Sequence, residues 1–349
     1  MRAKYMKVDA KCPDQDAIAL GGKLLREGRL VAFPTETVYG LGGNALDAGA
    51  SEKIYAAKGR PSDNPLIVHI ARMEDLYPIA AEIPENALVL AKSYWPGPLT
   101  MIFPKTDLVP LQTTGGLESV AVRFPSDPVA QALIIAAGGY VAAPSANTSG
   151  RPSPTTAQHV MEDLGERIDL ILDSGPVGIG LESTIVDFTQ EIPAVLRPGF
   201  ISLEMLTQIL GEVKMDPGLL KDDPDVRPKA PGMKYRHYAP KASLKIVEGR
   251  ETDVVRWINE QAEQAGAEGK KVGILAASES ADAYDFGEVI CVGSRSEEEE
   301  IARHLYDALR RFDSLGVDLI YSEAFDTPRM GTAIMNRLLK AAGHHCIRV

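Results

Sequence analysis

The sequence predicts an α+β protein of two domains, a larger one on a twisted mixed sheet and a smaller one on an open α/β sheet. Three observations support this prediction. The chain has 349 residues, about twice the usual length of one domain. Within residues 13–205 several strand-like runs follow one another without a helix between them, which favours a mixed sheet over a strictly parallel one. From residue 241 to residue 349, strand-like and helical segments alternate.

In the first domain, apolar residues recur with helical spacing between strand-like runs of β-branched and apolar residues. The predicted helices are Asp14–Arg26, Ala50–Ala57, Glu85–Ser93, Pro128–Ala136, Thr156–Leu164 and Ser202–Leu210. The predicted strands are Leu30–Phe33, Leu66–Ile70, Leu99–Phe103, Ser119–Phe124, Tyr140–Ala143, Leu170–Asp173, Ser183–Asp187 and Ala194–Leu196. Phe33–Gly43 is predicted to be a tight turn, because Pro and Gly punctuate it.

Residues 206–240 are predicted to be a linker, since from residue 212 they are rich in Pro and charge and lack apolar periodicity. The second domain is predicted to contain strands Leu244–Val247, Val272–Ala276, Val289–Val292 and Asp318–Ser322 and helices Thr252–Gln264, Glu297–Leu315 and Thr332–Ala341. On its long helix one face is apolar and should pack on the sheet: Ile301, Leu305, Ala308, Leu309 and Phe312. No GxGxxG dinucleotide fingerprint occurs in this Rossmann-like part.

Composition excludes several classes of protein. The net charge is −11 and no basic run occurs, which argues against a large basic surface for nucleic acid but leaves a small basic groove open. The three cysteines are scattered without a CxxC, as free thiols of a reducing compartment are. No histidine spacing suggests zinc, so no protein-bound metal is expected. The N-terminus lacks an apolar signal segment and Val129–Ala143 is interrupted by polar and glycine residues, so a cytoplasmic protein without membrane contact is expected.

Two cations after a predicted helix are candidates for binding phosphate. Lys58 and Arg60 stand two residues apart, beside Pro61, and are expected to be exposed loop cations. Together with the hydroxyls of Phe33–Gly43 they are suited to a polyanionic ligand. No GxxxxGK[ST] motif occurs, so a nucleotide would need another cradle. A merely solvated helix end is the alternative.

Two strand-borne arginines and two hydroxyl-rich loops add further candidates. Arg123 shares a strand face with small residues, and Arg197 ends another strand. Either could bind a carboxylate or phosphate with two hydrogen bonds, or could simply lie along the surface. The loops Ala143–Pro154 and Gly178–Thr184 offer hydroxyl and amide groups at strand ends. A turn without a ligand is the alternative for each loop.

Jointly, these motifs resemble a known family. FPTETVYGLGG, KGRPSDNPLIVH, WPGPLT, SVAVRFP, APSANTSGRPSPT, ESTIVD and LRPG, in this order, resemble the YrdC-like domain of threonylcarbamoyl-AMP synthases. The linker motif APGMKYRHYAP and the α/β domain after it resemble the long, two-domain form. The resemblance implies a YrdC-like catalytic domain at 13–205, a linker and active-site lid at 206–240, and a C-terminal α/β domain at 241–349.

The same resemblance implies an activity. Members of the family are nucleotidyltransferases that convert L-threonine, bicarbonate or CO2, and ATP to threonylcarbamoyl-AMP, pyrophosphate and water. This is the first step of tRNA threonylcarbamoyladenosine modification, and a downstream tRNA threonylcarbamoyl-transferase complex takes the product. Mg²⁺ is expected on the ATP phosphates, because no carboxylate cage stands out in the sequence.

Site residues follow by resemblance, residue by residue. The ATP positions are Lys58, Arg60, Ser62, Ser119, Ser145, Asn147, Ser153, Arg197, Arg236 and His237, of which the last two lie in the lid. The threonine positions are Thr35, His69, Arg123, Ala143 (through its backbone) and Ser183. Lys58 and Arg60 are expected to act catalytically by neutralising the leaving pyrophosphate, and Arg123 to anchor the threonine carboxylate.

The sequence leaves two alternative functions to be considered. The first is a double-stranded RNA or tRNA-binding module without catalysis, and weak RNA binding could also accompany the synthase; the acidic net charge counts against it. The second is a carbamoyltransferase of the hydrogenase-maturation type, which shares the Lys-x-Arg and Ser-x-Asn elements. That type carries acylphosphatase and Cys-rich zinc modules, which this sequence lacks.

Overall fold

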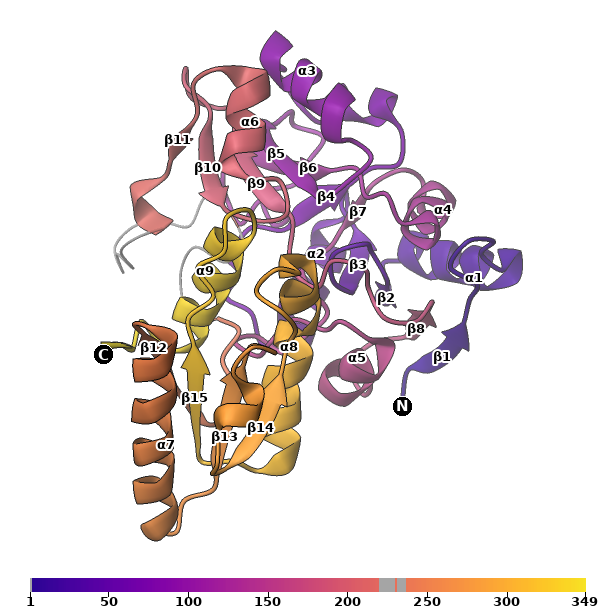
Figure 1. Ribbon diagram of the computed structural model, residues 1–349. Coiled ribbons are helices and arrows are strands. Elements are labelled where there is room, and N and C mark those ends of the chain that lie inside the picture. The colour runs from indigo at the N-terminus through magenta and orange to yellow at the C-terminus, as the bar shows by residue number, and fades with distance from the viewer. Residues whose placement is uncertain (1, 220–229, 231–236) are drawn as a thin grey trace. The chain divides into compact units, whose positions relative to one another are not determined.

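The computed structural model describes residues 2–219, 230 and 237–349, which form two compact units (Figure 1). The first unit comprises residues 1–149, 153–178 and 182–235, and the second comprises 150–152, 179–181 and 236–349. Two short segments that precede residue 182 thus belong to the second unit. The boundaries at residues 205 and 240 therefore stay predictions.

The described part of the first unit contains one mixed sheet, in the order β1-β8-β2-β3-β7-β4-β6-β5-β9-β10-β11. Its strands are β1 (Lys4–Lys7), β2 (Val31–Phe33), β3 (Gly40–Asn44), β4 (Ile67–His69), β5 (Leu99–Pro104), β6 (Ser119–Arg123), β7 (Val141–Ala142), β8 (Leu170–Asp173), β9 (Thr184–Asp187), β10 (Ala194–Arg197) and β11 (Lys214–Met215). The sheet contains both parallel pairs, such as β4–β6, and antiparallel pairs, such as β5–β6. The predicted mixed sheet is confirmed.

Helices cover both faces of this sheet. They are α1 (Gln15–Arg26), α2 (Ala48–Lys58), α3 (Glu85–Tyr94), α4 (Pro128–Ala137), α5 (Ala157–Leu164) and α6 (Leu203–Leu210), with 3₁₀ turns η1 (Met73–Leu76) and η2 (Pro217–Leu219). Side chains of α1 and α4 share one apolar core, and those of α2, α3, α5 and α6 share another. Gly22 lets α1 approach α4 closely, because a Cβ there would lie 2.6 Å from the Cβ of Ala136.

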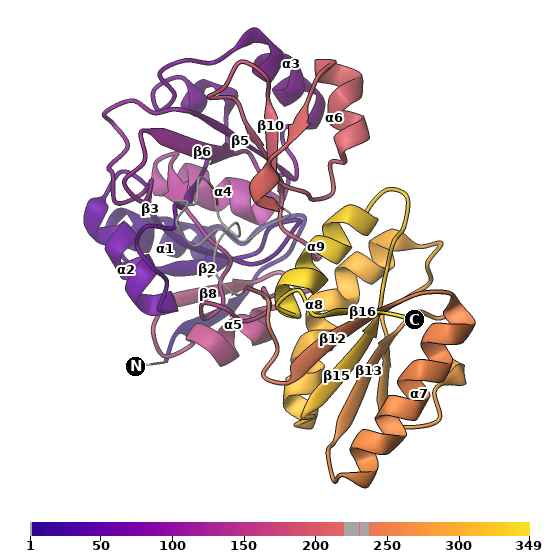
Figure 2. The same ribbon diagram turned by 90° about the vertical axis from the view of Figure 1, so that its left-hand side faces the viewer.

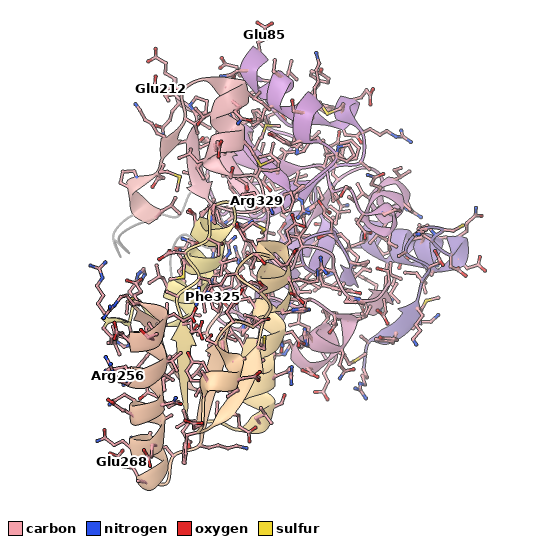
Figure 3. All side chains as sticks on the ribbon, viewed as in Figure 1. Glu85, Glu212, Arg256, Glu268, Phe325 and Arg329 are labelled. Atoms are coloured by element: carbon pink, nitrogen blue, oxygen red, sulfur yellow. The ribbon has the colours of Figure 1, made fainter. Side chains whose placement is uncertain are left out.

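The second unit is built on a parallel sheet in the order β14-β13-β15-β12-β16. Its elements are β12 (Ser243–Glu248), α7 (Glu251–Ala267), β13 (Val272–Ala276), η3 (Ala281–Ala283), β14 (Glu288–Cys291), α8 (Glu298–Leu315), β15 (Leu319–Glu323), α9 (Gly331–Ala341) and β16 (Cys346–Arg348). Figure 2 shows α7 on one side of this sheet and α8 and α9 on the other. Arg256 on α7 and Glu268 at its C-terminal cap project away from the sheet (Figure 3).

The predicted elements are present, with ends shifted by at most three residues, and the predicted apolar face of α8 is buried. Four strands were not predicted: β1, β3, β11 and β16. Of these, β3 lies inside the predicted turn Phe33–Gly43, and β11 lies inside the predicted linker. In the described residues, no helix combines the length and the hydropathy that crossing a bilayer requires.

Candidate active site

A row of polar side chains crosses the middle of the eleven-stranded sheet. His69 on β4 pairs with Arg123 on β6, and Arg123 pairs with Thr100 on β5. Thr100 in turn lies opposite Ile185 on β9, which pairs with Arg197 on β10. Residues paired across neighbouring strands point to the same face of a sheet. Register alone therefore brings three predicted site residues, His69, Arg123 and Arg197, to one face.

The predicted Lys-x-Arg and Ser-x-Asn elements meet at the end of α2. The Nζ atom of Lys58 donates to the backbone oxygens of Ser145 and Asn147, at 2.5 Å each, and lies 3.5 Å from Oδ1 of Asn147. The Ser145 hydroxyl donates to the same Oδ1 at 2.6 Å. One amine, one hydroxyl and one amide thus converge at a single point, which we call the Lys58 cluster (Lys58, Ser145 and Asn147).

Lys58 itself is not the exposed loop cation that the sequence suggested. It is the last residue of α2 and is 1% exposed, and Gly59 after it ends the helix in the left-handed conformation with φ 62°. The strand-end loop of Ser145 and Asn147 folds over it and supplies the oxygens that a buried ammonium group requires. The amine is consequently held in place before any ligand arrives.

Arg60 is also buried, but it turns into its own loop. Its guanidinium donates to Oδ1 of Asn64 at 2.6 Å and to the backbone oxygens of Asn64 and Pro65. Ser62, by contrast, is exposed. These three contacts use the Nε and Nη2 groups of a guanidinium that has five N–H donors in all.

Two further networks hold predicted site residues near β9. Ser183 lies between Thr100 and Arg197: its hydroxyl is 2.8 Å from the Thr100 hydroxyl and accepts from Arg197 Nη2 at 3.1 Å. Arg197 also donates from Nε to the Ser183 backbone oxygen. Ser153 is fully buried and donates to the carboxylate of Glu182 at 2.5 Å.

Arg123 faces a carboxylate that the sequence did not single out. Its Nη2 atom lies 2.8 Å from Oε1 of Glu36, and the two side chains are 5% and 15% exposed. Close by, Asp127 caps α4 by accepting from the Ala130 amide at 2.9 Å. Burial, together with the charge of Glu36, raises the pKa of Asp127 from 3.8 to about 6.

His69 is neutral throughout the physiological range. Burial, followed by the charge of Arg123, lowers its pKa from 6.5 to about 3. Its Nδ1 atom lies 3.1 Å from the backbone oxygen of Ile67, and its ring meets the Phe33 ring edge-on at 6.3 Å. The side chain therefore brings no charge to the row.

The remaining predicted residues are more scattered. Thr35 uses its hydroxyl to order the turn after β2, donating to Val38 O at 2.7 Å and accepting from the Thr37 and Val38 amides. The Ala143 amide donates to Ile67 O, so it belongs to the sheet. Ser119 begins β6, about 13 Å along the strand from Arg123 at 3.3 Å per residue. His237 belongs to the second unit, and Arg236 lies outside the described residues.

One described residue of the predicted linker, Ala230, lies on the same face of the sheet as the polar row. Ala230 is fully buried in an apolar cluster with residues of β4, β5, β6, β9 and β10. On β6 that cluster includes Ala121, two residues before Arg123 and hence on the same face. Ala230 thus lies on the face that carries Arg123.

Opposite pKa shifts of His69 and Asp127 predict a masked pH dependence of stability. Below pH 6.5, His69 binds a proton in the unfolded chain but stays neutral in the folded protein. The free energy of unfolding therefore falls by about 1.4 kcal/mol per pH unit down to about pH 3. Folded Asp127 takes up a proton below about pH 6 that the unfolded chain binds only near 3.8, which offsets this loss. In Asp127→Asn, which keeps a good helix cap, the free energy of unfolding should therefore fall relative to wild type by about 1.4 kcal/mol per unit between pH 6 and 4.

Urea unfolding of the two proteins at pH 6 and pH 4.5 measures this difference, and all other titrating groups cancel in it. A His69→Asn variant should show the opposite slope. Parallel pH profiles of wild type and Asp127→Asn would contradict the raised pKa of Asp127.

Comparison with known proteins identifies the family. Residues 23–199 match the family described as "Telomere recombination", and residues 201–343 match "Threonylcarbamoyl-AMP synthase, C-terminal domain". Relatives named "Threonylcarbamoyl-AMP synthase" from Pyrococcus abyssi and Bacillus subtilis are each 50% identical over 332 residues, covering 95% of this chain and 96% and 94% of theirs. The chain belongs to the threonylcarbamoyl-AMP synthase family.

A solved structure agrees with that assignment. The "Crystal structure of P. abyssi Sua5 complexed with L-threonine" matches with a TM-score of 0.93 at 48% identity, and the match covers 99% of each chain. The predicted resemblance, the fold class and the class of nucleotidyltransferase are thereby confirmed. A binding module without catalysis is not favoured, because the family name describes an enzyme.

Proposed function

We propose that this chain joins L-threonine, bicarbonate and ATP to form threonylcarbamoyl-AMP, and releases pyrophosphate and water. If CO2 takes the place of bicarbonate, no water is released. The observation that carries the proposal is the Lys58 cluster, in which a buried ammonium group is held beside a serine hydroxyl and an asparagine amide. Such a point charge among fixed dipoles is suited to a phosphate group. The threonine complex of the P. abyssi relative supports L-threonine as the amino-acid substrate.

For this reaction the protein must position the substrates and neutralise the negative charge of the phosphates. The threonine amine captures CO2 as a carbamate, whose oxygen attacks the α-phosphorus of ATP in line with the departing pyrophosphate. Little covalent work falls to side chains, so alignment and neutralisation of charge supply most of the rate enhancement. Lys58 and Arg60 neutralise the pyrophosphate, and Arg123 anchors the threonine carboxylate. The other predicted ATP and threonine positions complete the two subsites.

ATP is proposed to enter with Mg²⁺ on its phosphates. In the parts of the chain that the structure describes, no group of three or more His, Cys, Asp and Glu side chains could hold a metal ion. The ion would therefore be held by phosphate oxygens and water, as is common for Mg²⁺, and the protein positions it indirectly through the nucleotide. The compartment we propose is the cytoplasm, where a downstream tRNA threonylcarbamoyl-transferase complex consumes the product.

Pyrophosphate release tests the function directly. The purified chain with MgATP, bicarbonate and L-threonine should release pyrophosphate without any RNA, and omission of threonine should abolish the release. A requirement for RNA, or release that is equal without threonine, would contradict a synthase and favour the RNA-binding alternative. Added tRNA that changes neither rate nor mobility on a gel would exclude even weak RNA binding.

We propose further that residues 206–240 are a linker that also serves as the active-site lid, with Arg236 or His237 reaching the nucleotide. The burial of Ala230 on the face of the polar row supports this, and a lid keeps water from the labile carbamate and mixed anhydride. A chain ending at Gly211 should stay folded by circular dichroism but lose most synthase activity. A chain ending at Pro240 should recover part of it, because an untethered lid must be ordered on closing. Full activity of the shorter chain would contradict the lid.

A further inference from the structure

We propose that Glu36 binds the α-ammonium group of the amino-acid substrate, so that Glu36 and Arg123 together select a zwitterion. The inference deepens the proposed function and rests on it, because it assumes that Arg123 binds the substrate carboxylate. Glu36 was not among the residues expected to contact threonine. Its place in the structure, beside Arg123, is what assigns it this role.

The position of Glu36 is set by the turn between β2 and β3. The Thr35 hydroxyl accepts from the amides of Thr37 and Val38 and thereby holds the turn that Glu36 occupies. Phe33 and Gly40 pair on either side of the turn, which ties it to the sheet. Glu36 is consequently presented by a well-ordered backbone, as a residue that must meet a ligand at a defined point requires.

The Glu36–Arg123 pair is incomplete as a hydrogen-bonded structure. Oε1 of Glu36 and Nη2 of Arg123 are 2.8 Å apart. Yet among the described residues neither carboxylate oxygen of Glu36, nor Nε or Nη2 of Arg123, has a hydrogen-bond partner of acceptable geometry, although all four atoms are buried. Buried polar atoms are almost always hydrogen-bonded, and an exception calls for an explanation.

An amino acid supplies the missing partners. Its carboxylate accepts hydrogen bonds from a guanidinium, and its ammonium group donates up to three, which a carboxylate can accept. A cation and an anion side by side on the protein are therefore the counterpart of the carboxylate and ammonium groups that an α-amino acid carries on its Cα atom. A hydroxy acid of the same shape would satisfy Arg123 but leave Glu36 unpaired, and such mismatches discriminate strongly between ligands.

The neighbouring groups are consistent with Arg123 binding the substrate carboxylate and Glu36 binding its ammonium group. His69 pairs with Arg123 in the sheet and is neutral, so it offers no competing charge. Asp127 is the other carboxyl group close to Glu36 and Arg123, but its oxygen Oδ1 is engaged as the cap of α4. Glu36 is thus a carboxylate that has Arg123 as its ion-pair partner but accepts no hydrogen bond from a described residue, as an ammonium group would supply.

The test compares L-threonine with 3-hydroxybutyrate, which lacks the amine, as ligands of wild type and Glu36→Gln in ligand-observed NMR titrations. We expect Glu36→Gln to weaken threonine roughly tenfold or more, the usual effect of one charge-assisted hydrogen bond. The affinity for 3-hydroxybutyrate should stay the same or improve, because Arg123 no longer shares its charge with Glu36. Asp127→Asn is the matched control and should leave the ratio of the two affinities unchanged.

Two other outcomes would contradict the inference, and a third would contradict the proposed function. Equal losses for both ligands would mean that Glu36 acts only by positioning Arg123, and no loss for threonine would remove it from the site. Failure of wild type to bind threonine would instead contradict the proposed function. Circular dichroism and ATP affinity of each variant show whether the fold and the nucleotide subsite are retained.

Discussion

Replacing Lys58 by alanine is expected to lower pyrophosphate release by at least tenfold. A charge-assisted contact to phosphate contributes about 1.5–3 kcal/mol, and this amine lies at the centre of the Lys58 cluster. The same change should also destabilise the fold, since it leaves the Ser145 and Asn147 oxygens without their donor and opens a cavity at a residue that is 1% exposed. Each unsatisfied oxygen costs about 1–3 kcal/mol.

Lys58→Met separates the two effects. Methionine retains most of the side-chain volume but carries no charge, so it should recover part of the stability and none of the rate. Both variants are assayed at saturating ATP and at a temperature below the onset of unfolding, which circular dichroism determines. Turnover at the wild-type level in Lys58→Met would show that the cluster does not bind the phosphates.

Replacing Arg123 by alanine is expected to weaken threonine by roughly ten- to a hundredfold and to leave ATP binding unchanged. The guanidinium serves the amino-acid carboxylate only, through contacts of the charge-assisted kind. Calorimetric titration with threonine and with ATP measures the change in affinity for each ligand. Equal losses for the two ligands would place Arg123 outside the threonine subsite.

The same variant should lose stability as well. Removal of one partner of a buried ion pair leaves an uncompensated charge, at a cost of about 3–5 kcal/mol, and Glu36 is that charge here. The double variant Arg123→Ala/Glu36→Gln should recover part of this loss in urea unfolding, while its threonine affinity stays low. If the double variant is no more stable than Arg123→Ala, the two side chains do not interact as a pair.

Sequence motifs identified the residues that carry charge, but not their environment. Lys58 and Asn147 could be linked because the family signature pairs them, whereas the burial of Lys58 follows from a loop that folds back from residue 145. Thr100 and Asp127 carried no signal in the sequence. The register between β5 and β6 brings Thr100 beside Arg123, and the N-terminal cap of α4 brings Asp127 near it. Glu36 did stand in a motif, and what distinguishes it from an ordinary turn residue is its ion pair with Arg123 and the lack of a hydrogen-bond donor to its oxygens among the described residues.

The sequence predicted the fold correctly where apolar periodicity extends over many residues, and the prediction failed where strands are short. The helices and the central strands agree with their predicted ranges, since burial sets their pattern. β3 is rich in glycine and β11 has two residues, so neither shows a period that sequence alone can reveal. β1 and β16 are short, and most of their side chains are exposed, so only pairing with a neighbouring strand makes them regular.

The two strands at the ends of the eleven-stranded sheet protect this protein against aggregation. β1 and β11 are the sheet edges, and they have four and two residues. β1 has a lysine at each end, and β11 begins with one. Short edges that carry lysine offer few unpaired backbone groups to a strand of another molecule. A chain that ends before Lys214 would instead present β10, whose residues are all buried, so it should associate with itself as its concentration rises, and light scattering against concentration would show this.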